Sequence, residues 1–131
     1  FLINFVKDRL ADADCVNVLQ EVTISNKPQY NCYDDSTDKM LIQVHFGENE
    51  SLGGFAVELG GSSSKSFEIR DGNFPAEVTM FSGPQELPGK NEERTYTFSF
   101  ATKPDAVKIY PIMKNGKLCD ASDELNSVEL C

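Results

Sequence analysis

Side chains that could carry out catalysis are few and scattered in this sequence. His45 is its single histidine, and it is the natural candidate for a general base because an unperturbed imidazole titrates near neutrality. It falls on the polar side of an alternating apolar stretch, and neither a GxSxG motif nor an unpaired catalytic cysteine accompanies it. We therefore interpret His45 as a surface residue and predict that the chain is not an enzyme.

Two acidic clusters, residues 34–38 and 120–124, raise the question of calcium binding. Hard cations need several oxygen ligands at short range, but neither cluster matches an EF-hand loop. Asp and Ser are also favoured in turns and helix caps. We interpret both clusters as solvated loops and predict no metal or cofactor site, with calcium as the lesser alternative.

The four cysteines indicate the compartment. They are even in number, form no CxxC pair and lie far in sequence from the histidine, so two disulfides are favoured over a zinc site. Three pairings are open, and we favour the local ones, Cys15 with Cys32 and Cys119 with Cys131. Persistent disulfides indicate an oxidising space, so we predict a secreted or surface-displayed protein. Asn49 starts a sequon that is compatible with glycosylation there.

Composition and charge narrow the class of protein further. The chain has 131 residues, 40% of them hydrophobic, which is enough to build the core of one domain. Its 21 acidic and 12 basic residues give a formal charge of -9. Such a field repels phosphate backbones and anionic lipid surfaces, so we predict no nucleic-acid partner.

Residues 1–14 differ from the rest, because their apolar side chains follow a helical stripe. The segment is too short to span a bilayer and lacks the basic start of a signal peptide. It predicts either a short amphipathic helix docked on the domain or the end of a longer hydrophobic helix.

From Cys15 onward the apolar residues alternate with period two, and turn residues recur at short intervals. A long helical period is missing there, which argues against an α/β fold. We predict an all-β fold, an antiparallel immunoglobulin-like β-sandwich of seven or eight strands, with a disulfide-stapled domain over residues 15–131. The expected strands lie within residues 16–24, 40–46, 55–59, 67–69, 78–81, 95–100 and 107–113, with a hairpin tip at 60–64 and a turn at 71–72.

Several short patterns together resemble a known family. They are the apolar start that ends at Asp14-Cys15, the sequence Asn31-Cys32-Tyr33, the Leu-Pro-Gly turn at 87–89 before the expected strand at 94–100, and the ending 107–120 closed by Cys131. In layout the chain resembles the extracellular domain of archaeal type IV pilin-like and archaellin-like filament subunits. The resemblance implies that the N-terminal helix packs in a filament core, although such helices normally run longer. The implied assembly residues are Phe1, Leu2, Ile3, Phe5 and Val6.

We therefore expect a structural subunit of an extracellular filament, with copies of itself or other surface proteins as partners. A membrane would be involved only through a longer precursor helix. One alternative is a secreted β-sandwich that binds a glycan or lipid in a sizeable apolar pocket. Another is an adhesin-type domain that recognises a host protein through loops 47–54 and 82–93.

Overall fold

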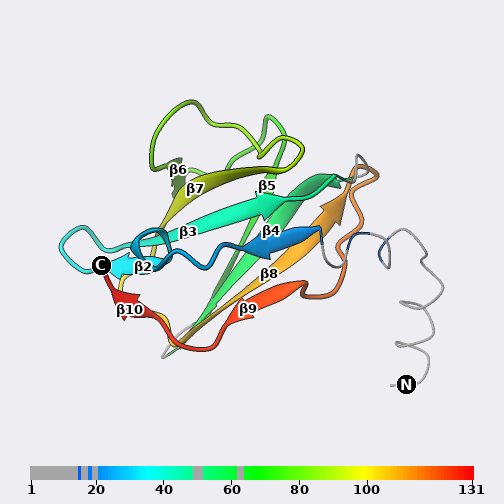
Figure 1. Ribbon diagram of the computed structural model, residues 1–131. Helices are drawn as coiled ribbons and strands as arrows, with labels where there is room; N and C mark the ends of the chain where they lie inside the picture. Colours follow the sequence, from blue (N-terminus) through cyan, green and yellow to red (C-terminus); the bar gives the residue numbers. More distant parts are fainter. Residues whose placement is uncertain (1–14, 16–17, 19–20, 49–51, 62–63) are drawn as a thin grey trace, which may run out of the picture.

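The computed structural model describes residues 15, 18, 21–48, 52–61 and 64–131, and this part of the chain is all-β (Figure 1). The helix expected within residues 1–14, the proposed assembly residues there and Asn49 lie outside the described residues. One 3-10 helix and ten strands are described: β1 (Val22–Ile24), η1 (Pro28–Tyr30), β2 (Cys32–Asp34), β3 (Lys39–Phe46), β4 (Leu52–Gly60), β5 (Lys65–Arg70), β6 (Val78–Met80), β7 (Glu92–Ser99), β8 (Ala106–Met113), β9 (Asp123–Leu125) and β10 (Glu129–Leu130).

The strands form two sheets. Sheet A has the order β10-β2-β3-β7-β6, and β1 also pairs with β3. All its pairs are antiparallel except β10 with β2. Because β7 occupies one side of β3 along its full length, β1 and β2 share the other side, and η1 lies between them in the chain.

Sheet B has the order β5-β4-β8-β9 and is antiparallel throughout. The β4–β5 hairpin confirms the tip predicted at residues 60–64, and Gly72 adopts the left-handed conformation (φ 72°) that the turn after β5 requires. The register shifts between Leu52 and Gly54, where the backbones approach closely. A Cβ atom on Gly54 would overlap the carbonyl oxygen of Ile69, so only glycine fits there.

Apolar side chains from both sheets share one hydrophobic core. Phe55 of β4 contacts Phe46 of β3 and Tyr96 of β7, with ring centroids 6.1 and 5.1 Å apart and edge-to-face geometry. The face predicted for β3 is confirmed, because Met40, Ile42, Val44 and Phe46 belong to this core, whereas Leu41 is buried but does not belong to it.

The first predicted strand is wrong in part. Strand β1 starts only at Val22, and Val18 has helical backbone. Cys15, Val18 and Val22 are spaced three and four residues apart and all are buried, which is helical spacing as much as it is alternation. The amide of Glu21 donates to the carbonyl of Val18 at 3.0 Å and closes the turn that leads into β1.

All four cysteines form disulfides, as predicted, but the predicted pairing is wrong. The bonds join Cys15 to Cys119 and Cys32 to Cys131, across 104 and 99 residues of sequence. Strand β10 pairs with β2 in parallel and brings Cys131 beside Cys32. The two bonds are compatible with an oxidising compartment.

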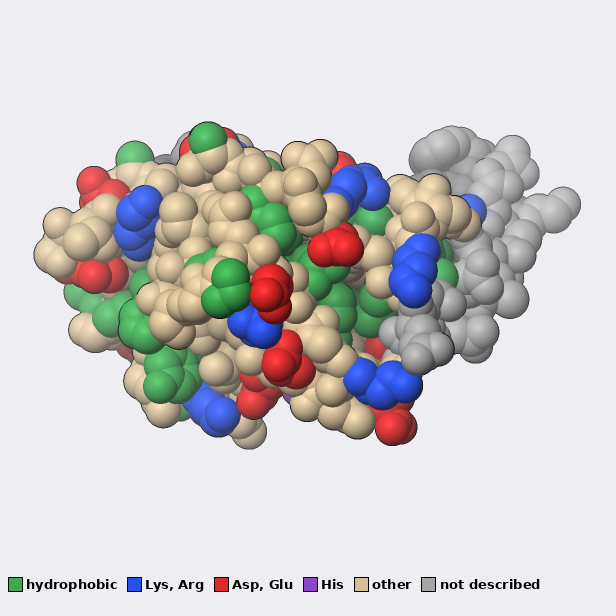
Figure 2. Space-filling model, turned by 90° about the horizontal axis from the view of Figure 1, so that it is seen from above, with side chains coloured by type: hydrophobic (Ala, Val, Ile, Leu, Met, Phe, Trp, Pro, Cys, Tyr) green, Lys and Arg blue, Asp and Glu red, His purple; other side chains and the backbone are tan. Residues whose placement is uncertain are grey.

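The charge of -9 is not gathered on the face shown in Figure 2, where basic and acidic side chains are interspersed. Two ion pairs link neighbouring segments: the first joins the start of β5 to the residue before β6, and the second joins β7 to the loop before it. Lys65 pairs with Glu77, and Arg94 reaches Glu86 at 3.0 Å.

Candidate binding cleft

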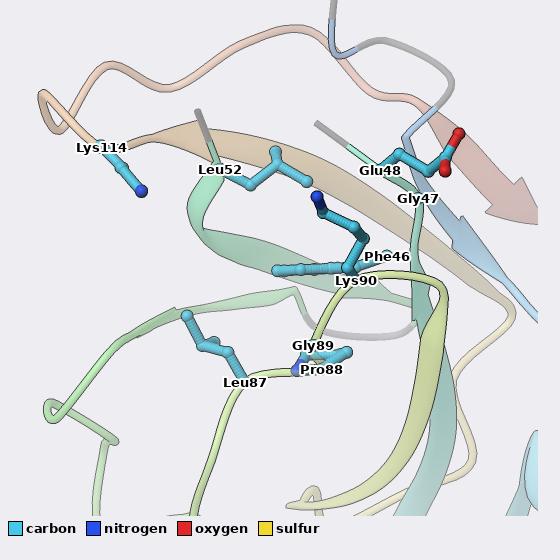
Figure 3. Close-up of a pocket in the computed structure, with 9 residues that line it drawn as sticks. All are labelled: Phe46, Gly47, Glu48, Leu52, Leu87, Pro88, Gly89, Lys90 and Lys114. Atoms are coloured by element: carbon cyan, nitrogen blue, oxygen red, sulfur yellow. The ribbon is translucent and has the colours of Figure 1, made fainter. Parts of the chain in front are cut away.

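Two loops, residues 47–54 and 82–93, are those expected to recognise a partner. The described parts of the first loop, residues 47–48 and 52–54, lie beside the second loop at one end of the sheets. The amide of Asn91 donates to the carbonyl of Gly47 at 3.1 Å and joins them directly. Between the loops is a cavity of about 290 Å³, which we call the cleft (Figure 3). Its size is at the lower end of the range of small-molecule sites.

The floor of the cleft is apolar. Phe46 ends β3 and Leu52 begins β4, and both are nearly buried, at 5% and 8% exposure. Leu87 faces them from the second loop and packs partly against the core. A neighbouring hollow of about 460 Å³ shares Leu52 and Leu87 and extends the cleft towards Arg70.

The rim of the cleft is basic. Lys90, Lys114 and Arg70 line the two hollows against the acidic Glu48 and Asp71, so three positive and two negative side chains leave +1 there. The chain as a whole carries -9. In Figure 3 Lys114 and Glu48 lie on opposite sides of the cleft. An anionic group is therefore attracted to this end of the protein more than to its average surface.

Hydrogen bonds fix the second loop to sheet A. The hydroxyl of Tyr96 donates to the carbonyl of Glu86 at 2.6 Å, and burial raises the pKa of Tyr96, so it remains a donor at neutral pH. Arg94 donates to Glu86 and Glu92, both at 3.0 Å. The loop is thus held in shape without a ligand.

Glu92 closes the tip of the same loop. Its Oε1 atom accepts from the amide of Gly89 at 2.7 Å, and this bond is the main reason that the pKa of Glu92 lies below its ordinary value. The first loop is held by Glu21, which accepts from the amides of Gly47 (2.7 Å, through its carbonyl) and Glu48 (3.1 Å, through Oε1).

His45 lies away from the cleft floor and is half-buried on β3, opposite Thr23 of β1 and Glu93 of β7. The cluster at 34–38 is a turn, as predicted: Asp34 accepts from the hydroxyl and amide of Ser36 at 2.6 and 3.0 Å. These bonds lower the pKa of Asp34.

The cluster at 120–124 is not only a loop. Asp123 and Glu124 belong to β9, and Asp123 Oδ2 accepts from the amide of Ile24 at 2.8 Å, so it links β9 to β1. Over the described ranges, no three His, Cys, Asp or Glu residues are grouped as a metal ion would require.

The sequence predicted the two loops, the first of which includes Leu52, but missed Lys114 as part of the same site. Lys114 follows β8, and only the pairing of β4 with β8 brings it to the cleft, with Met113 opposite Leu52. No local pattern in the sequence reports such a contact between strands far apart in the chain.

Comparison of the chain with known protein families, with curated proteins and with solved structures finds no match. The pilin-like resemblance therefore stays a prediction. In the part of the chain that the structure describes, no helix has the length and apolar character needed to cross a bilayer.

Proposed function

We propose that this protein is an extracellular recognition domain, an immunoglobulin-like β-sandwich that binds its ligand in the cleft and catalyses no reaction. The observation that carries the proposal is the convergence of two loops around an apolar floor with a basic rim. The shared core of sheets A and B supports the sandwich, and two disulfides that close long loops support an extracellular location.

The cleft suits a ligand with an apolar body and a carboxylate. Phe46, Leu52 and Leu87 offer the body a surface on which it leaves water, which contributes about 25 cal/mol per Å² of apolar area. Lys90 and Lys114 offer the carboxylate positive charge at the rim. The preformed second loop, residues 82–93, reduces the entropy that binding must overcome.

The test uses octanoate, which has this chemistry, and octyl glucoside, which has the same tail without the charge. Below micelle concentrations, octanoate should shift the backbone amide resonances of Gly47, Gly89 and Lys90 in NMR spectra, and octyl glucoside should shift them less. Replacing the two rim lysines, Lys90→Gln with Lys114→Gln, should weaken octanoate binding by about tenfold. Lys117→Gln is the matched control, because Lys117 is exposed in the same turn as Lys114 but does not line the cleft.

Octanoate that shifts resonances elsewhere, or that binds the lysine double variant and the control equally well, would show that the cleft is not the site.

A filament subunit is the second candidate, and one observation favours it. Cys15 follows directly after residues 1–14, and its bond to Cys119 ties this point of the chain covalently to the segment after β8. A tether at this position would carry force from an assembled N-terminal segment into the sheets without unfolding β1. In that arrangement the end with the Cys32–Cys131 bond would be displayed, because Val22 pairs with Phe46 and the chain therefore enters β1 from the cleft end.

The filament candidate makes its own prediction for residues 1–14. The full chain should self-associate in sedimentation velocity, and changing Phe1, Leu2, Ile3, Phe5 and Val6 together to Ser should leave it monomeric, because apolar contact would be the driving force. A wild-type chain that stays monomeric at all concentrations, or a Ser variant that associates as the wild type does, would exclude this candidate and leave the cleft proposal intact.

A further inference from the structure

A separate hollow lies on the face of sheet A that is turned away from the core, and we call it the outer groove. Its volume is about 580 Å³, and it shares no lining residue with the cleft. Its floor comes from β3 and β7, and η1 and the segment after β6 supply its walls. An amide, two aromatic rings and four charged residues are among those that line it: Gln43, Tyr30, Phe81, Lys27, Glu92, Glu93 and Arg94.

Gln43 gives the outer groove a buried polar atom that lacks a partner. The alternation of β3 turns its side chain away from the core, yet Gln43 is only 8% exposed. Its Nε2 atom donates to Thr95 Oγ1 at 3.2 Å, whereas Oε1 is buried and has no hydrogen-bond partner within the described residues. Exchanging the oxygen and the nitrogen of the Gln43 amide does not solve this. The oxygen would then accept from the Thr95 hydroxyl, and the amide nitrogen would be the atom without a partner.

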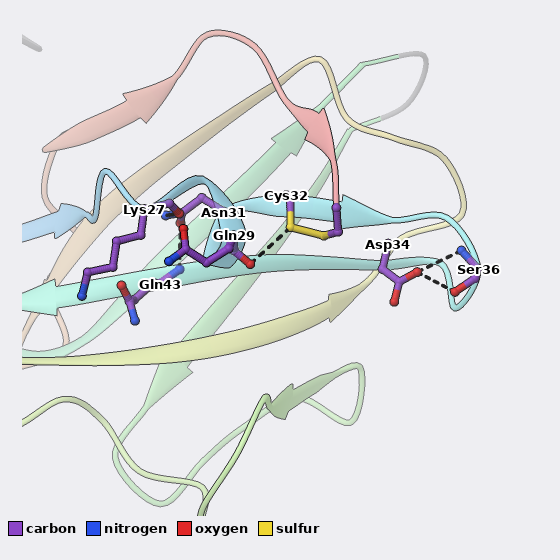
Figure 4. The surroundings of a disulfide bond; sticks show 8 residues. Lys27, Gln29, Asn31, Cys32, Asp34, Ser36 and Gln43 are labelled. Atoms are coloured by element: carbon purple, nitrogen blue, oxygen red, sulfur yellow. Dashed lines mark hydrogen bonds between the residues drawn. A yellow bond between two sulfur atoms is a disulfide. The ribbon is translucent and has the colours of Figure 1, made fainter.

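The neighbouring amide shows that the fold can satisfy such a group. Asn31 is equally buried, at 8% exposure, and its Oδ1 atom accepts from the amide of Gln43 at 2.8 Å (Figure 4). Its Nδ2 atom donates to the carbonyls of Ser25 and Lys27, both at 2.9 Å. Buried polar atoms are nearly always paired, and an unpaired one costs stability. The atom left over on Gln43 therefore points to a partner outside the chain.

Two aromatic rings form an apolar wall beside this amide. Tyr30 of η1 and Phe81 meet edge-to-face, with ring centroids 6.0 Å apart and planes at 68°. Phe81 is 53% exposed, which leaves one ring largely open to solvent at the mouth of a polar groove. Such a ring can pack against the C–H face of a ligand.

The charges that line the outer groove cancel and pair with one another. Lys27 and Arg94 stand against Glu92 and Glu93, two positive and two negative side chains. Lys27 lies 3.3 Å from Glu93, and Arg94 lies 3.0 Å from Glu92. Unlike the cleft, the outer groove therefore favours a neutral ligand that both donates and accepts hydrogen bonds.

We propose that the outer groove binds a neutral saccharide. A sugar ring offers an apolar C–H face for Phe81 and Tyr30, and one of its hydroxyls can donate to Gln43 Oε1. The Lys27–Glu93 pair is partly exposed, with side-chain exposures of 47% and 33%. Because surface ion pairs contribute little to stability, this pair can open and admit a hydroxyl to the amide.

The test is an NMR titration of the wild-type chain with the methyl glycosides of glucose, galactose, mannose and N-acetylglucosamine. At least one should shift the side-chain amide resonances of Gln43 and the backbone amides of Ser82 and Thr95. Phe81→Ala should weaken that binding by about tenfold, the effect expected for one aromatic contact. Leu118→Ala is the matched control, because Leu118 is 47% exposed and does not line the outer groove.

A second variant separates binding from folding. Gln43→Met keeps the side-chain volume and removes the unpartnered atom, so the melting temperature should stay the same or rise while saccharide binding is lost. If none of the four glycosides shifts these resonances, or if Gln43→Met lowers the melting temperature and leaves binding unchanged, the proposal is overturned. Octanoate binding in the cleft is measured separately, so failure at one site is distinguishable from failure at the other.

Discussion

The two ends of β3 differ in how completely they are closed. At its first end the Cys32–Cys131 disulfide joins β2 to the chain terminus, and the Tyr33 hydroxyl donates to the carbonyl of Phe100 at 2.7 Å. At its last end, Phe46 opens onto the cleft beneath loops 47–54 and 82–93. Each end has one disulfide, because Cys15–Cys119 joins the segment before β1 to the segment after β8 near the cleft. The first end, which we call the closed end, has the further buried bond of Tyr33, whereas the cleft end has an apolar floor and exposed lysines at its rim.

This difference indicates how the chain separates stability from recognition. Bonds that close long loops restrict the unfolded state and leave the cleft surface unchanged. Loop residues are then free to be glycine or lysine, which contribute little to the core. The comparison predicts large losses of stability for changes at the closed end and small losses at the cleft rim.

The largest expected effect comes from removing the disulfide at the closed end. Cys32→Ala with Cys131→Ala should lower the free energy of unfolding by about 4 kcal/mol, because with Cys15–Cys119 intact the bond still closes a further loop of about 30 residues. Urea denaturation followed by circular dichroism measures this loss. The pair Cys15→Ala with Cys119→Ala should lose a similar amount, and a loss below about 1 kcal/mol for either pair would contradict the loop-closure explanation.

The next effect concerns the buried amide between β1 and β2. Asn31→Ala should cost about 3 kcal/mol, because it leaves the amide of Gln43 and two carbonyls without their partners. Asn126→Ala, at an exposed position, is the control and should change little. Equal unfolding midpoints for the two variants would show that Asn31 does not organise this connection.

A smaller loss is expected at Tyr33, together with a dependence on alkaline pH. Tyr33→Phe should cost about 1 kcal/mol, since it removes the hydroxyl that donates to Phe100 and Asp38. Burial raises the pKa of Tyr33, and burial followed by the bond to Glu58 raises the pKa of Tyr110 to about 12.

Groups whose pKa is higher in the folded state stabilise the protein below their unfolded pKa, near 10, and lose that contribution as the pH rises. The urea midpoint should therefore fall between about pH 10 and 12, and less steeply in Tyr110→Phe. A wild-type midpoint that is constant over this range would contradict the burial of the Tyr33 hydroxyl and the bond of the Tyr110 hydroxyl to Glu58.

The smallest effect on stability is expected at the cleft rim. Lys90→Gln with Lys114→Gln should change the free energy of unfolding by no more than about 0.5 kcal/mol, because both side chains are exposed. Thermal denaturation measures this, and a loss comparable with that of Tyr33→Phe would mean that the lysines serve the fold.

The long strands could be predicted from the sequence, whereas the short strands could not. The alternation of Met40, Ile42, Val44 and Phe46 marks one face of β3, and the presence of all four side chains in the shared core confirms it. Strands β2, β9 and β10 have only two or three residues, too few to show a period. The disulfide pairing was missed for the same reason, because β10 is what brings Cys131 to Cys32.

The candidate sites were harder to predict than the fold. Loops 47–54 and 82–93 could be named from their turn residues, but Lys114 joins them only through the pairing of β4 with β8. From the sequence alone, Gln43 is expected to be an exposed polar residue on the outer face of a strand. Its burial depends on η1 and Asn31, which cover that part of β3.

Peptide mapping without reduction tests the account most directly, because the two disulfides underlie both the stability of the fold and the oxidising compartment. After proteolysis of the native protein, mass spectrometry should find the peptide of Cys15 joined to that of Cys119, and the peptide of Cys32 joined to that of Cys131. Peptides that join Cys15 to Cys32, or four free thiols, would contradict it.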